Sequence, residues 1–210
     1  MPRIWSSPLA ILFAIALSLP LWGQNFREKG DDLLLAGRYD DARSLALAAL
    51  AADSSDLEAS ILLSDSLLGL GRPSDAWNYA TKAWTLHKDP RLAEILGAAA
   101  FDVGRNDDAL TWLRYYLAAA PEGPRAGTAY YLTGEIYLRL GRYGHADMAI
   151  SAAIYHSPGN ARWWSRLAWA QEKAGDLRQA LKSYESALAI DPSLDDALIG
   201  RTRVLARLRP

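Results

Sequence analysis

Two arginines and a tryptophan near the end of the chain have the spacing of a small binding surface. Arg162 and Arg166 are one helical turn apart, and Trp169 follows within the next turn, so a helix would place all three on one face. Guanidinium groups form charge-assisted hydrogen bonds with carboxylates, and an indole offers a large apolar anchor. The spacing therefore predicts noncovalent binding of a carboxylate or an acidic peptide.

The sequence has no recognisable catalytic motif. It contains no His-Glu-x-x-His, Gly-x-Ser-x-Gly, P-loop or dinucleotide-binding glycine loop. His87, His145 and His156 are not at metal-ligand spacing, and there is no Cys to serve as nucleophile, thiolate ligand or disulfide partner. We therefore expect a protein that is not an enzyme and that uses neither a metal nor a cofactor.

Charge excludes a further class of partner. The chain has 23 basic and 24 acidic residues and a net charge of −1, so no overall field would attract it to nucleic acid or to an acidic membrane. We expect a protein or peptide partner, and the sequence does not indicate an oligomeric state.

The elements that must position the binding residues recur along the chain. A Gly followed five residues later by Ala occurs five times, and the glycines are 34, 33, 37 and 34 residues apart: Gly37/Ala42, Gly71/Ala76, Gly104/Ala109, Gly141/Ala146 and Gly175/Ala180. Amphipathic helical segments flank each pair, and a constant period in this range is typical of a solenoid built from stacked helix pairs.

The last of these units resembles the tetratricopeptide repeat (TPR) family, whose pattern is W-x2-L-G-x2-Y…A-x3-F…P. It departs from that pattern at Ala168 and Gln171, and the matching residues are Trp164, Leu167, Ala180, Tyr184 and Pro192. The resemblance implies an all-α, right-handed superhelical solenoid of antiparallel helix pairs. About five repeats are expected, over residues 24–56, 57–89, 90–123, 127–160 and 161–194.

A final helix is predicted within residues 195–210. Its apolar residues are expected to cover the end of the last repeat and its arginines to face outward, as a solubilising cap. The apolar residues are Leu198, Val204, Leu205 and Leu208, and the arginines are Arg201, Arg203, Arg207 and Arg209.

The resemblance also implies where a ligand would bind, because the first helix of each repeat lines the concave groove in this family. The groove positions of this chain are Arg162, Arg166, Trp169 and Lys173 in the last repeat, Tyr131, Glu135 and Arg139 in the fourth, and Phe101 in the third. We expect them to bind a peptide or a partner helix. An alternative is a carbohydrate or muropeptide that stacks on Trp169 and Tyr131. Other aromatic residues occupy the family's core positions: Trp164, Tyr130, Tyr137 and Tyr184.

Acidic residues open most of the second helices, at Asp40-Asp41, Asp75, Asp107-Asp108 and Asp176. Paired carboxylates can serve acid–base catalysis, but carboxylates at helix N-termini more often accept backbone N–H bonds and favour the helix dipole. We interpret them as helix-start residues.

The first 23 residues differ in character from the repeats. Arg3 precedes the apolar run Leu9–Leu19, Pro20 ends that run, and Leu21-Trp22-Gly23 is an acceptable cleavage site. We predict a signal peptide cleaved before Gln24 and a periplasmic or otherwise exported scaffold of the bacterial cell envelope. The alternative is an uncleaved N-terminal anchor, which would make the protein a membrane-tethered envelope assembly factor.

Overall fold

The computed structural model describes residues 25–209, and every regular element in this range is an α-helix. The chain forms two compact units, which meet in sequence between His87 and Lys88. Within residues 25–209, none of the helices combines the length and the apolar character that crossing a bilayer would require. The predicted signal peptide or anchor, residues 1–23, lies outside the described residues.

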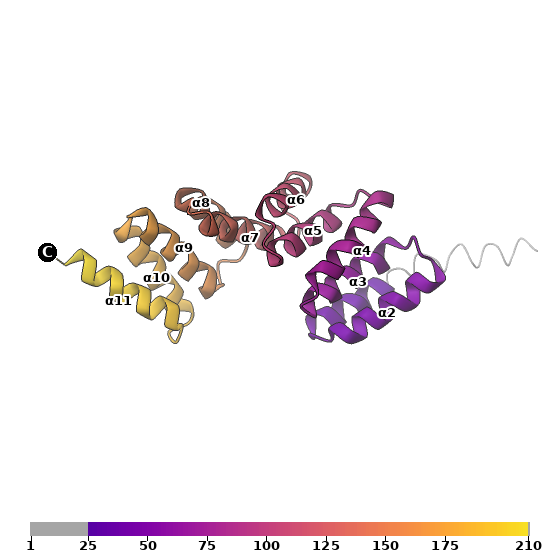
Figure 1. Ribbon diagram of the computed structural model, residues 1–210. Coiled ribbons are helices and arrows are strands. Elements are labelled where there is room, and N and C mark those ends of the chain that lie inside the picture. The colour runs from indigo at the N-terminus through magenta and orange to yellow at the C-terminus, as the bar shows by residue number, and fades with distance from the viewer. Residues whose placement is uncertain (1–24, 210) are drawn as a thin grey trace, which may run out of the picture. The chain divides into compact units, whose positions relative to one another are not determined.

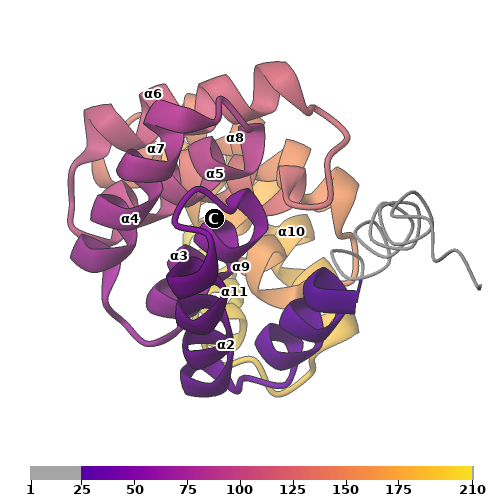
Figure 2. The ribbon, with the colours of Figure 1, turned by 90° about the vertical axis from the view of Figure 1, so that its right-hand side faces the viewer.

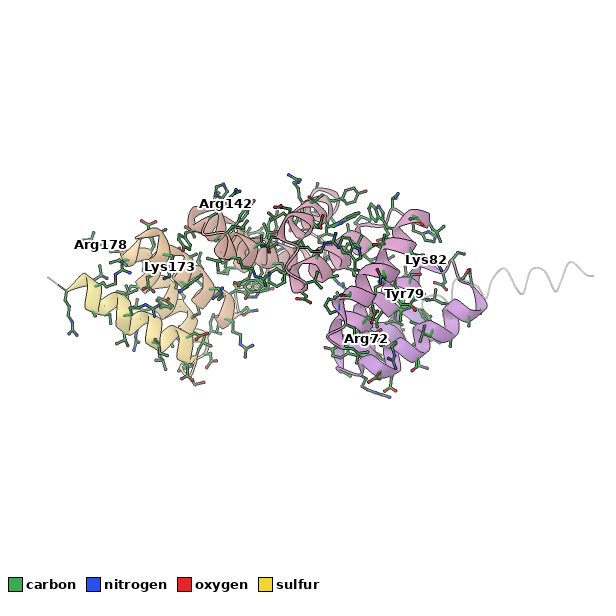
Figure 3. The ribbon with its side chains drawn as sticks, in the orientation of Figure 1. Arg72, Tyr79, Lys82, Arg142, Lys173 and Arg178 are labelled. Carbon is green, nitrogen blue, oxygen red and sulfur yellow. The ribbon has the colours of Figure 1, made fainter. Side chains whose placement is uncertain are left out.

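The first unit contains two helix pairs. A helix whose described part covers residues 25–35 precedes α2 (Tyr39–Ala52), and α3 (Leu57–Gly69) precedes α4 (Pro73–Leu86). Figures 1 and 2 show these helices in two views, and α3 packs against both α2 and α4. Tyr79 and Lys82, labelled in Figure 3, lie on α4 beside a small apolar cavity of about 240 Å³.

The second unit contains three helix pairs and a final single helix. The pairs are α5 (Pro90–Asp102) with α6 (Asn106–Ala119), α7 (Ala126–Arg139) with α8 (Tyr143–His156), and α9 (Ala161–Ala174) with α10 (Leu177–Ile190). The last helix, α11 (Asp195–Leu208), packs on α10 and α9. α5 also contacts α7, so the first helices of consecutive pairs are neighbours. This is the predicted all-α architecture of stacked helix pairs.

The five glycines that define the repeat end the first helix of each pair. All five have φ between 67° and 93°, a left-handed conformation that glycine adopts without the steric penalty of a Cβ atom. The next residue then donates its N–H to a carbonyl five residues back, as Arg142 does to Tyr137 and Asp176 to Gln171. This pattern is a Schellman motif, which satisfies carbonyls at the helix end and reverses the chain.

Small residues allow the two helices of a pair to approach closely. The five repeat alanines are fully buried. A Cβ atom added to Gly134 would overlap Ile150 of the partner helix, and one added to Gly200 would overlap the ring of Tyr184. Because Gly200 belongs to α11, the final helix packs on α10 as the first helix of a further repeat would.

The core of the last repeat confirms the packing roles of two predicted aromatics and corrects the account of the cap. Tyr184 is buried, and Trp164 packs against the same cluster. α11 buries Ala197, Gly200 and Val204. Leu205 and Leu208, expected to cover this core, are instead 40% and 37% exposed, because the buried stripe of α11 passes through its small residues.

The acidic residues lie at the starts of the second helices, as interpreted, but they do not form the expected side-chain cap hydrogen bonds. No N-cap side chain forms a hydrogen bond with the backbone at the start of α2, α4, α6 or α10. In the first three, an arginine at the N-cap bonds the aspartate three residues later, at 2.7–2.8 Å: Arg38–Asp41, Arg72–Asp75 and Arg105–Asp108. Side-chain caps occur on first helices instead, at Asp56, Asp89 and Asn160.

Candidate functional site

The predicted binding residues of α9 lie on one side of that helix. Arg162, Arg166, Trp169 and Lys173 are spaced by four, three and four residues, which keeps them on one helical face. Arg166 lies 4.9 Å and Lys173 5.5 Å from the centre of the Trp169 ring, both at cation–π distance. Figure 3 labels Lys173.

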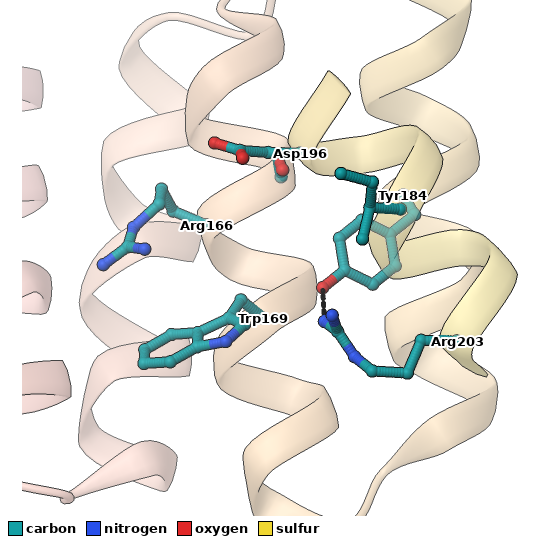
Figure 4. A pocket seen from close by; sticks show the side chains of 7 residues that line it. Arg166, Trp169, Tyr184, Asp196 and Arg203 are labelled. Atoms are coloured by element: carbon teal, nitrogen blue, oxygen red, sulfur yellow. Dashed lines mark hydrogen bonds between the residues drawn. The ribbon is translucent and has the colours of Figure 1, made fainter. Parts of the chain in front are cut away.

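Two adjoining cavities lie beside this face, and together they form what we call the α9–α11 groove. A cavity of about 520 Å³ is lined by Tyr131, Arg162, Ser165, Arg166, Asp191, Ser193, Leu194, Asp195 and Asp196. A smaller one, of about 190 Å³, is lined by Ser165, Arg166, Trp169, Tyr184, Asp196, Ile199 and Arg203 (Figure 4). Ser165, Arg166 and Asp196 border both, so the two cavities adjoin between α9 and α11.

The structure brings together four of the eight predicted residues in this groove: Tyr131, Arg162, Arg166 and Trp169. Glu135 contacts the groove through Arg166. Phe101, Arg139 and Lys173 line neither cavity. Arg139 instead stacks over the Phe101 ring at 3.7 Å and donates to the Phe101 carbonyl at 2.9 Å, which binds α7 to α5.

Arg166 already has a carboxylate partner inside the protein. Its Nε and one terminal nitrogen each donate to Glu135, both at 2.7 Å. Burial opposes the charge of Arg166, but the hydrogen bonds and the charge of Glu135 outweigh this and raise its pKa. A ligand carboxylate would have to compete with Glu135 for the same guanidinium group, which weakens the expectation that Arg166 recognises an acidic ligand.

Tyr131 is held in the same network. Its ring stacks on Trp163 with the centroids 5.2 Å apart and the planes 13° apart. Burial and, after it, the charge of Glu135 raise the pKa of Tyr131 to about 12. The phenol therefore stays neutral at physiological pH and offers a hydroxyl group at the edge of the groove.

A buried carboxylate joins α9 to the cap helix. Glu172 accepts two hydrogen bonds of 2.6 Å from Arg203 and one of 3.1 Å from the Tyr184 hydroxyl, and Arg207 approaches to 3.4 Å. The Arg203 hydrogen bonds lower the pKa of Glu172, although burial opposes this, and in turn they raise the pKa of Arg203. The expectation that Arg203 and Arg207 simply face outward is therefore wrong, because both neutralise Glu172.

Ion pairs of this kind join consecutive first helices throughout the second unit. Glu94 of α5 pairs with Arg125, which precedes α7, Glu135 of α7 with Arg166 of α9, and Glu172 of α9 with Arg203 of α11. In each case 31 residues separate the partners. The three glutamates are buried or nearly so, with side-chain exposures of 5%, 14% and 4%.

Sequence reasoning missed the residues that α11 contributes to the groove. Asp196, Ile199 and Arg203 occupy the positions that Arg162, Ser165 and Trp169 occupy one 34-residue period earlier. Extending the period past the last complete repeat would have found them. The expectation that α11 is only a cap is therefore incomplete, because this helix both covers the last repeat and forms one wall of the groove.

Within residues 25–209, no group of three or more His, Asp or Glu side chains is arranged to hold a metal ion. The side chains that line the α9–α11 groove can contact a ligand through charge, hydrogen bonds and apolar surface.

Solved structures share this architecture. A crystal structure of MamA is 26% identical and has a TM-score of 0.65, with 78% of this chain and 94% of that chain covered. The fold is shared by MamA from Desulfovibrio magneticus, which is 20% identical with a TM-score of 0.66, with 82% of this chain and 96% of that chain covered. It is also shared by a thermophilic TPR protein of Thermus thermophilus, which is 24% identical with a TM-score of 0.65, with 87% of this chain and 98% of that chain covered.

No curated protein sequence matches this chain closely enough to count as a relative. Sequence profiles described as tetratricopeptide repeat match residues 161–194 and residues 27–83, 65–124 and 96–146. Together these matches cover residues 27–146 and 161–194, which is more than half of the chain and includes helices of all five pairs. The chain therefore belongs to the tetratricopeptide repeat family.

Proposed function

We propose that this protein is a non-enzymatic scaffold that binds an extended peptide or a partner helix in the α9–α11 groove. The fold and the likeness to MamA support a role in protein–protein interaction generally. The observation that carries the specific proposal is that two adjoining cavities share the lining residues Ser165, Arg166 and Asp196. Both cavities are lined by residues of α9 and α11, and the larger one falls within the range of volumes typical of ligand sites.

The groove offers the mixed surface that peptide binding requires. Trp169 and Ile199 supply apolar area, and Ile199 is 61% exposed although it is a large aliphatic residue. Arg162 and Asp196 supply charge, while Ser165 supplies a hydroxyl group. Interfaces of this composition combine one or two apolar anchors with polar groups that fix orientation.

The sugar-binding alternative receives less support from the same residues. Stacking on a sugar needs an open aromatic face, but one face of Tyr131 is covered by Trp163. Two cations, Arg166 and Lys173, lie near the Trp169 ring. Tyr143 packs against the same ring in a T-shaped arrangement, with the ring centroids 6.4 Å apart. A peptide needs no such open face, so it fits the groove better.

A crosslinking pull-down with paired variants tests the proposal. The groove variant combines Arg162→Glu with Ile199→Lys, two exposed or partly exposed residues, so the fold should be retained. The matched control combines Arg178→Glu on α10 with Leu205→Lys on α11, which make the same kinds of change away from the cavities. We expect a protein captured by the wild type and the control but not by the groove variant. Equal capture by all three would exclude this groove as the binding site.

We also propose that the scaffold acts in the bacterial cell envelope, after export directed by residues 1–23. The support is the sequence pattern of Arg3, the apolar run Leu9–Leu19 and Gly23. Intact-mass measurement of the protein from its native host tests this. A mature chain that starts at Gln24 is the expected result, whereas a full-length chain in the membrane fraction would favour a tethered assembly factor.

A further inference from the structure

The larger cavity of the α9–α11 groove carries an excess of negative charge, although the sequence predicted a positive one. The smaller cavity adds Arg203, whose charge is already paired with Glu172. Arg162 and Arg166 are the cations of the larger cavity, and three aspartates face them: Asp191, Asp195 and Asp196. Arg166 is neutralised by a fourth carboxylate, Glu135, which forms both of its short hydrogen bonds.

The positive charge of Arg162, the other arginine of the larger cavity, is also balanced by a nearby carboxylate. Hydrogen bonds from Ser193 and, to a smaller extent, the nearby charge of Arg162 lower the pKa of Asp191, so this carboxylate is ionised beside Arg162. Asp195 and Asp196 remain. Neither forms an ion pair or a side-chain hydrogen bond with any other residue in the 25–209 range, and Asp196 acts on Arg166 only through its charge.

A second feature of the groove is independent of this charge count. Ser165 is only 5% exposed and borders both cavities, yet its hydroxyl forms no hydrogen bond with the described part of the chain. The other buried serines of the described helices, Ser64, Ser66 and Ser183, each donate a hydrogen bond within the protein. Because buried polar groups usually have a partner, a hydroxyl that borders a cavity and has no partner within the described chain is available to bond a ligand.

We propose that the α9–α11 groove binds a peptide segment through a lysine or arginine side chain, which Asp195 and Asp196 hold while Ser165 contacts the same segment. This rests on the proposed function and names the chemistry of its ligand. The aliphatic part of such a side chain would lie along Trp169 and Ile199, since long cationic side chains combine an apolar stem with a charged end. Carboxylates without a hydrogen-bonded partner on an open surface favour a cation by charge complementarity.

The test uses the full chain and a phage-displayed library of random short peptides as the probe. Enriched peptides are synthesised with a fluorescent label, and their affinities are measured by anisotropy. Three proteins are compared: the wild type, the double variant Asp195→Asn/Asp196→Asn, and a control, Asp176→Asn/Glu185→Gln, which neutralises two exposed acids of the preceding repeat outside the groove. Circular dichroism establishes that each variant is folded.

We expect enriched peptides to share a lysine or arginine at one position. The Asp195→Asn/Asp196→Asn variant should bind them about tenfold or more weakly, as loss of a charge-assisted contact predicts, while the control binds as the wild type does. Replacing the shared basic residue of the peptide by Gln should cause a similar loss, and combining both changes should add little. The charge-preserving variant Asp196→Glu should keep most of the affinity.

The opposite results separate this inference from the proposed function. Peptides rich in acidic residues that lose affinity with Arg162→Glu/Ile199→Lys, but not with Asp195→Asn/Asp196→Asn, would refute the cation preference and support the groove. Peptides indifferent to every groove variant, or a library with no enrichment, would refute both.

Discussion

The ion pair between Glu172 and Arg203 gives the sharpest test of how the end of this stack is held together. We consider the substitution Arg203→Met, which keeps the aliphatic stem and removes the guanidinium group. The carboxylate of Glu172 is 4% exposed and would lose both of its 2.6 Å hydrogen bonds. It would retain the Tyr184 hydroxyl and the more distant Arg207.

The magnitude follows from these contacts. Breaking a buried ion pair costs about 3–5 kcal/mol when no other partner remains. Arg203 is 45% exposed and Glu172 keeps two donors, so solvent and the remaining partners reduce this loss. A hydrogen bond to a charged group contributes about 1.5–3 kcal/mol, and we take about 2 kcal/mol as the expected loss.

Hydrogen exchange is the appropriate measurement, because a stack of repeats can open at one end without unfolding globally. Among the helices of residues 25–209, α11 packs mainly on α10 and α9, whereas α9 packs on α8, α10 and α11. Because α11 has fewer neighbouring helices, it should open first. A loss of about 2 kcal/mol corresponds to about thirtyfold faster exchange of the α11 amides. Amides of α5 and α6 should be unchanged. Arg178→Met, an exposed arginine of α10, serves as the control.

A second variant tests whether the loss of stability comes from leaving the buried carboxylate of Glu172 unpaired. Glu172→Gln leaves Arg203 partly in solvent, where water can replace its partner, so it should cost less than Arg203→Met. The double variant should be more stable than the sum of the single changes predicts, because it leaves no buried charge unpaired. Exchange in α11 that changes less than about twofold in Arg203→Met, or strict additivity, would refute the argument.

Three further predictions concern packing, backbone and pH. Gly200→Ala should destabilise α11 by about 1–3 kcal/mol through overlap with the Tyr184 ring, seen as faster α11 exchange. In urea unfolding, Gly141→Ala should lower stability by about 1 kcal/mol or more, because φ is +68° there, whereas Gly144→Ala, in open space on α8, should raise it by about 0.5 kcal/mol. The pKa of Glu172 is lowered from 4.5 on folding, so its stabilisation is present above pH 4.5 and is lost as pH falls through the folded pKa. Acid should therefore loosen α11 in the wild type more than in Glu172→Gln, measured by exchange corrected for its intrinsic pH dependence.

The fold could be predicted from the sequence because its constraints are local and repeated. A glycine is required where φ is positive, and a buried alanine is required where two helices touch, as at Gly141 and Ala146. Both requirements recur with the period of the repeat, so several weak signals combine. The starts of the second helices show the limit of this reasoning. An aspartate such as Asp41 can either cap the helix or pair with Arg38, and the sequence alone does not distinguish a cap from an ion pair.

The site was harder to predict because its charges depend on contacts between repeats. Family positions brought Arg162 and Arg166 to the groove, but they gave no information that Glu135 would occupy Arg166. The 31-residue spacing of Glu and Arg occurs three times and was present in the sequence. The glutamate and the arginine of each pair, however, occupy different positions within their repeats from one pair to the next. Aligning the repeats on their glycines therefore does not reveal the spacing.

The final helix joins stability and recognition in one element. Arg203 of α11 neutralises a buried carboxylate, while Asp195 and Asp196 of the same helix line the proposed cation site. Apparent affinity falls only in proportion to the fraction of molecules in which the site is formed. Arg203→Met should therefore leave peptide binding nearly unchanged in buffer, where α11 stays mostly folded. It should weaken binding in urea concentrations that open α11 alone, and the decline should follow the exchange of α11 amides. Weaker binding in buffer without any opening of α11 would instead indicate that Arg203, which borders the smaller cavity, contacts the ligand directly.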